Sequence, residues 1–217
     1  KDLKNKLTKE VDRFNNTSKT YLFKLSIPIF FSNLAIPFVG LVDTGLMGHL
    51  SSEKFLAAIS IATSVITMIF WSFGFLRMGT VGLVAQSLGK KDWNEITLIF
   101  IRNLVLALFF GFFLILLKNP ILLLIEHFFK TSQETQLLIN NYISIRIYSA
   151  PAELILYVLS GLYLGLQKTK IASLAMTIFC IGNIILSSVL VINFKLEISG
   201  AAAGTLISAY FTVIIFL

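Results

Sequence analysis

Residues 104–117 read LVLALFFGFFLILL, and this uncharged run decides the class of fold. Together with residues 95–103 it forms a mostly apolar segment of more than 20 residues, and a helix needs about 20 to cross the ~30 Å hydrocarbon core of a bilayer. The whole chain agrees: of its 217 residues, 56% are apolar and 13% are charged, and the mean hydropathy is +0.85. An ordinary soluble domain is about 25% charged. The chain is therefore expected to be an integral membrane protein, and a soluble fold and a disordered chain are excluded.

The same criterion of length and apolarity predicts an all-α bundle of six transmembrane helices. Alternation with a period of two residues is absent, so membrane-spanning strands are not expected. Residues 121–130 are too few to cross a bilayer and are expected to lie at its surface or to continue a neighbouring helix. Residues 1–20 are polar and cationic, and we interpret them as a cytoplasmic arm. The six-helix unit, 21–217, has predicted spans at residues 21–47, 55–78, 95–117, 135–165, 170–193 and 199–217.

The basic residues predict the orientation of these helices. With the N-terminus in the cytoplasm, eleven Lys or Arg residues fall on the inner side and four on the outer side, as the positive-inside rule requires. The four outer residues are Lys54, Lys118, Lys130 and Lys195. Apolar runs separate the basic residues, so the net charge of +7 indicates a membrane flank rather than a nucleic-acid surface. The expected location is a bacterial cytoplasmic membrane, with lipid as a partner.

Two carboxyl groups lie where a bilayer tolerates charge poorly. Asp43 comes late in the first predicted span and Glu153 near the middle of the fourth. A charge at the centre of a spanning helix costs about 2.5–3.5 kcal/mol on insertion scales, so each is a functional candidate unless it is hydrated or paired. Burial disfavours the ionised form, so such a group can exchange a proton. For Glu153 the alternative is equally strong, because Arg146 lies two turns earlier on the same face and would neutralise it.

Other polar and helix-bending residues in the spans have more ordinary interpretations. Pro28 in the first span and Pro151 in the fourth each remove an intrahelical hydrogen bond, so a bend is expected at both. Asn183 and Ser187 share one face of the fifth span, and Thr205 lies on a small, hydroxyl-bearing stripe of the sixth. Interhelical contact is the default role of such residues, and contact with an ion or a substrate is the alternative.

The sequence carries no motif of an enzyme. It has no zinc-binding His-Glu-x-x-His, no Gly-x-Ser-x-Gly and no phosphate-binding loop, and its single cysteine, Cys180, excludes an internal disulfide. No enzymatic activity and no organic cofactor are expected.

Several blocks of the sequence resemble the N-terminal half of the multidrug and toxic compound extrusion (MATE) transporters, DinF-like branch. Their order and spacing match from about residue 20 onward. The resemblance implies one lobe of a twelve-helix antiporter that exports organic, often cationic, compounds in exchange for protons or sodium ions, with a C-terminal six-helix lobe as partner. The blocks are residues 26–33 (SIPIFFSN), 40–49 (GLVDTGLMGH), 75–80 (FLRMGT), 82–89 (GLVAQSLG) and 200–205 (GAAAGT).

The resemblance also implies which residues couple transport to the ion. It assigns cation coupling, and a possible sodium site, to Asp43, Asn183 and Thr205, in a pocket between the first, second, fifth and sixth spans. It assigns bending of the first helix to Pro28. Relatives usually have Asp where this chain has Ser187, so the second carboxylate is missing and Asp43 is favoured as a lone proton carrier. Further candidate residues are Ser187, Glu153 and Asn33.

Two other functions stay open at this point. The absence of an acid at Ser187 is compatible with a truncated, non-transporting remnant or a membrane scaffold. A lipid or polyisoprenoid flippase is the second alternative, and it would use Arg146 or Arg77 to bind a phosphate group.

Overall fold

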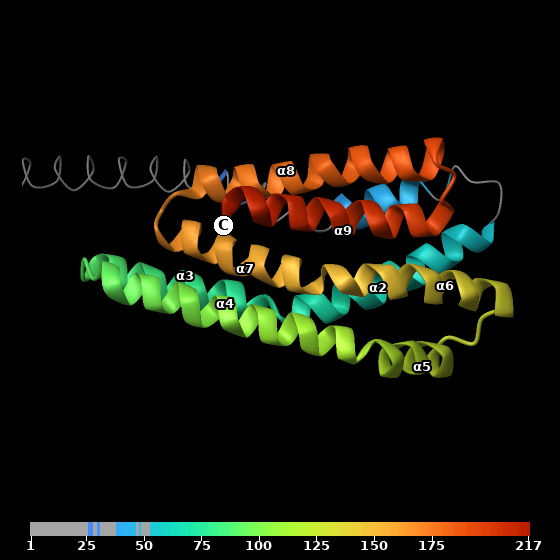
Figure 1. Cartoon of the computed structure of the whole chain (residues 1–217), viewed down its shortest axis with the longest axis horizontal. Helices are drawn as coiled ribbons and strands as arrows, with labels where there is room; N and C mark the ends of the chain where they lie inside the picture. Colours follow the sequence, from blue (N-terminus) through green and yellow to red (C-terminus); the bar gives the residue numbers. More distant parts are fainter. Residues whose placement is uncertain (1–25, 28–29, 31–37, 47, 49–52) are drawn as a thin grey trace, which may run out of the picture.

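The computed structural model describes residues 26–27, 30, 38–46, 48 and 53–217, and these form an all-helical bundle (Figure 1). Of the first predicted span, the described residues 26–27, 30 and 38–46 are all helical. The predicted arm 1–20, Pro28 and Asn33 lie outside the described residues. Within the described part, five helical stretches are long and apolar enough to span a membrane.

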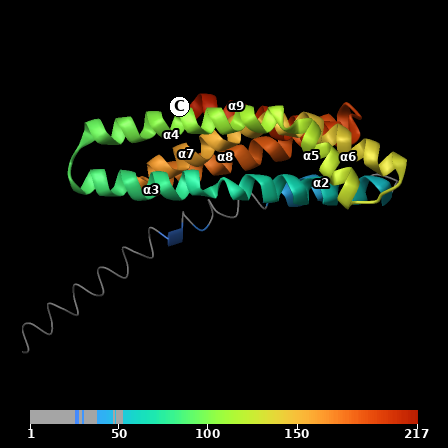
Figure 2. The ribbon, with the colours of Figure 1, turned by 90° about the horizontal axis from the view of Figure 1, so that it is seen from below.

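The first of these stretches is longer than the predicted span 55–78. Helix α2 (Glu53–Ser72) and helix α3 (Gly74–Gly89) follow one another with only Phe73 between them, and the whole stretch has 37 residues. At 1.5 Å per residue it is about 55 Å long, which exceeds a bilayer with its headgroups. Helix α3 packs along α7 (Ala150–Gly165), and residues 90–92 connect it to α4 (Trp93–Leu116), which runs back in the opposite direction (Figure 2).

Local capping explains where several helices begin. Helix α4 (Trp93–Leu116) starts after Asp92, whose side chain accepts a hydrogen bond from the Glu95 N–H at 3.0 Å. Helix α5 (Lys118–Phe128) has only 11 residues. Helix α6 (Gln133–Arg146) starts after Ser132, whose hydroxyl oxygen accepts from the Thr135 N–H at 3.3 Å.

The predicted fourth span consists of two helices. Helix α6 is followed by a 3₁₀ turn, η1 (Ile147–Ser149), and then by α7 (Ala150–Gly165). Pro151 lies in the first turn of α7, where its missing N–H leaves no internal bond unmade. Where the sequence predicted a bend at Pro151, the structure has a 3₁₀ turn just before this residue. The Tyr210 hydroxyl of the last helix donates a hydrogen bond to the Tyr148 carbonyl of this turn at 3.0 Å.

The chain ends in a pair of closely packed helices. Helix α8 (Thr169–Ser188) continues into a π turn, η2 (Val189–Asn193), and α9 (Glu197–Phe216) returns beside it. Gly204 makes this close approach possible, because a Cβ there would lie 2.6 Å from the Ser187 backbone nitrogen.

Helix α7 is the centre of the bundle. It contacts α3, α4, α8 and α9, and nearly all its residues are buried (Figure 1). Elsewhere many large apolar side chains are exposed, for example Phe109 and Phe112 on α4. An apolar exterior around a closely packed interior is what a helical bundle needs in lipid.

Candidate functional site

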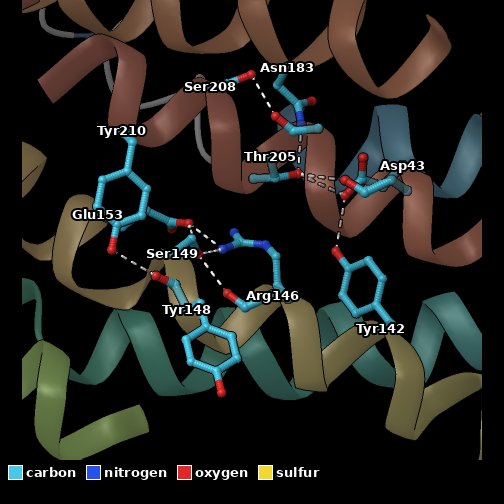
Figure 3. A network of polar contacts seen from close by, with 12 residues as sticks. Asp43, Tyr142, Arg146, Tyr148, Ser149, Glu153, Asn183, Thr205, Ser208 and Tyr210 are labelled. Atoms are coloured by element: carbon cyan, nitrogen blue, oxygen red, sulfur yellow. Dashed lines mark hydrogen bonds and ion pairs between the residues drawn. The ribbon is translucent and has the colours of Figure 1, made fainter. Parts of the chain in front are cut away.

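Asp43 lies at the centre of a polar cluster built from several helices (Figure 3). Its side chain is fully buried. The hydroxyl of Tyr142, on α6, donates to Asp43 Oδ2 at 3.0 Å. The hydroxyl of Thr205, on α9, lies 3.4 Å from the same oxygen. Helices far apart in the sequence therefore meet at one carboxyl group.

Asn183, on α8, joins this cluster through Thr205. Its amide nitrogen donates to Thr205 Oγ1 at 2.7 Å and to Ser187 Oγ at 3.2 Å. Ser187 in turn donates to the Ala201 carbonyl of α9 at 3.3 Å. The structure thus brings together Asp43, Asn183, Thr205 and Ser187, and all four side chains are buried.

Two oxygen atoms of the cluster have no hydrogen-bond partner among the described residues. They are Asp43 Oδ1 and Asn183 Oδ1. Buried polar atoms are nearly always paired, so each such atom calls for an explanation. An unpaired carboxylate oxygen can take up a proton or contact a cation, whereas Oδ2 of the same carboxylate already accepts the Tyr142 hydroxyl.

Glu153 belongs to a neighbouring ion pair. The Arg146 guanidinium donates through Nη1 to Glu153 Oε1 and to the hydroxyl of Ser149, and both charged side chains are only 7% exposed. Arg146 and Glu153, two helical turns apart, therefore form an ion pair. This is the neutralising pair predicted from the sequence as the alternative role of Glu153. The guanidinium also lies over the Phe70 ring of α2, 5.2 Å from its centroid.

A small cavity connects the cluster with the ion pair. Its lining includes Asp43 of the helical segment 38–46, Thr67 of α2, Tyr142 and Arg146 of α6, and Glu153 of α7. This cavity differs from the expected pocket between the first, second, fifth and sixth spans, because the fourth span contributes Arg146 and Glu153 to its lining.

The sequence interpretation missed Tyr142. Its position carries a signal, because it lies one helical turn before Arg146 and so extends backward the polar face that includes Arg146 and Glu153. An aromatic residue in an apolar span does not by itself indicate a polar role. Arg77, considered for phosphate binding, is on α3 and does not line the cavity.

The geometry defines a class of protein: a multi-pass helical membrane protein that encloses a buried carboxyl group between its helices. The sequence profile of the MatE family matches residues 28–189. The chain belongs to this family of membrane transporters, and these are not enzymes.

Two curated relatives illustrate the relationship. The chain is 35% identical over 202 residues, 93% of its own length, to "DNA damage-inducible protein F" of Escherichia coli K12, of which it covers 44%. It is 24% identical over 187 residues, 86% of its length, to "Multidrug export protein MepA" of Staphylococcus aureus, of which it covers 42%. The chain thus spans less than half the length of the curated relatives it matches.

A solved structure shows the same fold. The structure described as "Crystal structure of MATE in the bent conformation" superposes with a TM-score of 0.83 at 23% identity, over 89% of this chain and 43% of that one. The predicted all-helical membrane fold of half a MATE-type transporter is therefore confirmed, with five candidate spans in the part of the chain that the structure describes.

Proposed function

We propose that this chain is the N-terminal lobe, residues 21–217, of a secondary active antiporter that exports organic, often cationic, compounds in exchange for protons. A second six-helix lobe would complete the transporter. The N-terminus and the arm 1–20 are proposed to lie in the cytoplasm, as the distribution of basic residues indicates. The curated relative MepA carries the description of a multidrug export protein.

The observation that carries the proposal is the surroundings of Asp43. The carboxyl group is fully buried, one of its oxygens accepts the Tyr142 hydroxyl, and the other has no partner among the described residues. A proton can therefore bind at Oδ1 without breaking a hydrogen bond. Protonation changes the charge at the point where the helical segment 38–46 meets α6 and α9, so it changes the packing of these helices against one another.

The driving force for such a cycle is adequate. One elementary charge moved through the membrane potential is worth about 2.3 kcal/mol per 100 mV, before any pH gradient is added. Pro28 is proposed to let the first helix bend during the cycle. Asn33 of the same predicted span is proposed as an additional residue of the coupling site.

Sodium is the less favoured coupling ion. Asn183 directs its amide nitrogen, which cannot bind a cation, toward Thr205, and Ser187 offers a hydroxyl in place of a second carboxylate. In the described part of the chain, no three His, Cys, Asp or Glu side chains come together as a metal site. A sodium site at Asp43, Asn183 and Thr205 requires the Asn183 amide to turn over.

The flippase alternative loses support because Arg146 already has a carboxylate partner in Glu153. A phosphate group would have to compete with a buried charge pair.

The test uses the full protein in proteoliposomes that carry an imposed pH gradient. Asp43→Asn keeps the size of the side chain and is expected to abolish ethidium export. Thr212→Val is the matched control, because the Thr212 hydroxyl only donates to the Ser208 carbonyl of its own helix at 2.8 Å. Export by D43N at the wild-type rate would refute the proposal, and absence of export from the wild type and T212V would favour the remnant.

A further inference from the structure

Arg146 is one buried cation beside two buried carboxyl groups. It pairs directly with Glu153, and it lines the same cavity as Asp43. It also interacts electrostatically with Asp43. Tyr142, which donates to Asp43, lies one turn before Arg146 on α6 (Figure 3).

The charges of these three groups do not cancel when all are ionised. Arginine stays protonated in proteins, so one positive charge faces two negative ones. A buried net charge is costly, and the cavity reaches neutrality when one of the two carboxyl groups holds a proton. In this structure the guanidinium is bound to Glu153 through Nη1, while its Nε has no partner among the described residues.

We propose that Glu153 is a positioning residue for proton coupling: by holding the Arg146 guanidinium, it leaves Asp43 as the carboxyl group that takes up the proton. This inference rests on the proposed function, since it concerns the same proton. When Asp43 loses its proton, the guanidinium is shared between two carboxylates, and its free Nε is the donor available for a second one. The O–H bond at Asp43 Oδ1 breaks, the proton passes to water, and no other covalent bond is made or broken.

Among the described residues, the other groups around the pair do not supply an alternative cation. On α7, Tyr157 lies one turn after Glu153 and interacts with it electrostatically. Arg77 of α3 interacts with Tyr157 rather than with Asp43. Tyr142 of α6 and Thr205 of α9 face Asp43 as neutral donors. From α2, the cavity receives the uncharged side chains Thr63, Ile66, Thr67 and Phe70, and from α8 it receives Phe179.

The experiment measures protonated carboxyl groups directly, without transport. The C=O stretching band of protonated carboxyl groups is followed by infrared spectroscopy against pH, using the full protein in nanodiscs, and the D43N spectrum identifies the contribution of Asp43. Glu153→Gln frees Arg146 to stabilise the Asp43 carboxylate, so the band is expected to titrate about one pH unit or more lower than in the wild type. Arg146→Gln removes the cation and is expected to move the band in the opposite direction.

Two further variants separate this role from simple packing. Arg146→Met combined with Glu153→Met removes both charges and is expected to return the midpoint close to that of the wild type. Glu153→Asp keeps the charge and is expected to leave it unchanged. If E153Q and R146Q titrate like the wild type, or if the double variant shifts as far as E153Q, the proposal is overturned.

A second test compares the wild type with D43N, in which Arg146 and Glu153 both keep their native side chains. Because the Arg146 guanidinium is paired with Glu153, we expect D43N to remove the buried carboxyl band completely. A remaining buried band that Glu153→Asp displaces would show that Glu153 holds a proton itself and would overturn the proposal. Transport is measured separately: if the bands behave as expected while D43N still exports ethidium, the proposed function fails and the role of Glu153 stands.

Discussion

The contact between α8 and α9 at Gly204 is the point where a single methyl group should disable the site. In Gly204→Ala, the new Cβ would lie 2.6 Å from the Ser187 backbone nitrogen and 2.7 Å from its Cα. Contacts of this kind are ordinary from 3.4 Å outward, so the two helices must separate by about 0.8 Å. Overpacking of this degree costs about 1–3 kcal/mol.

The same displacement acts on the polar cluster. Asn183 and Ser187 are on α8, and Thr205 is the residue after Gly204 on α9, so the 2.7 Å bond from Asn183 to Thr205 lengthens beyond good hydrogen-bond geometry. G204A is therefore expected to lower both the thermal stability of the purified protein and its export of ethidium.

Gly182→Ala is the matched control for this change. It adds the same methyl group to the same helix pair, but its Cβ would lie 3.4 Å from Ser208 Oγ, which is an ordinary contact. It is expected to melt and to transport like the wild type. If G204A matches G182A in melting temperature and in export rate, the argument from helix spacing is wrong.

Two further substitutions address single groups of the cluster. Tyr142→Phe removes the hydroxyl that donates to Asp43. A hydrogen bond to a charged group is worth about 1.5–3 kcal/mol, so export at neutral pH should fall about tenfold or more. Tyr163→Phe is the control, because the Tyr163 hydroxyl donates to the Phe216 carbonyl, and equal export rates of the two variants would contradict the argument. Ser187→Asp supplies a second carboxylate beside Asn183 and should make export respond to a sodium gradient in proteoliposomes, whereas Ser187→Asn should not. Export by S187D that ignores sodium would show that the acid does not complete a cation site.

Hydropathy predicted the fold because each apolar run has the length of a bilayer crossing. It did not predict that α3 continues to Gly89, since this part is rich in glycine and less apolar. Tertiary contact explains the difference: Gly161 of α7 lets the helices approach so closely that a Cβ there would lie 2.7 Å from Thr80 Cβ. Hydropathy measures preference for lipid and does not include contacts between helices.

The site was predictable only in part. The cost of burying a charge was enough to single out Asp43 and Glu153, and the spacing of Arg146 was enough to anticipate its ion pair. That Asn183 and Thr205 meet Asp43 was suggested by family resemblance, because no local pattern tells which helices are neighbours. Tyr142 was not predicted, because its hydroxyl meets Asp43 only when the helical segment 38–46 lies against α6.

The enclosure of α7 has a consequence for the biogenesis of the protein. This helix carries Glu153 and is covered by α3, α4, α8 and α9, so it meets almost no lipid once the bundle is complete. While the chain is being synthesised, α7 emerges before α8 and α9 exist to cover it. Its acidic side chain then relies on Arg146, which precedes it in the chain, for neutralisation. The ion pair thus favours partitioning of the nascent helix into the membrane before α8 and α9 arrive.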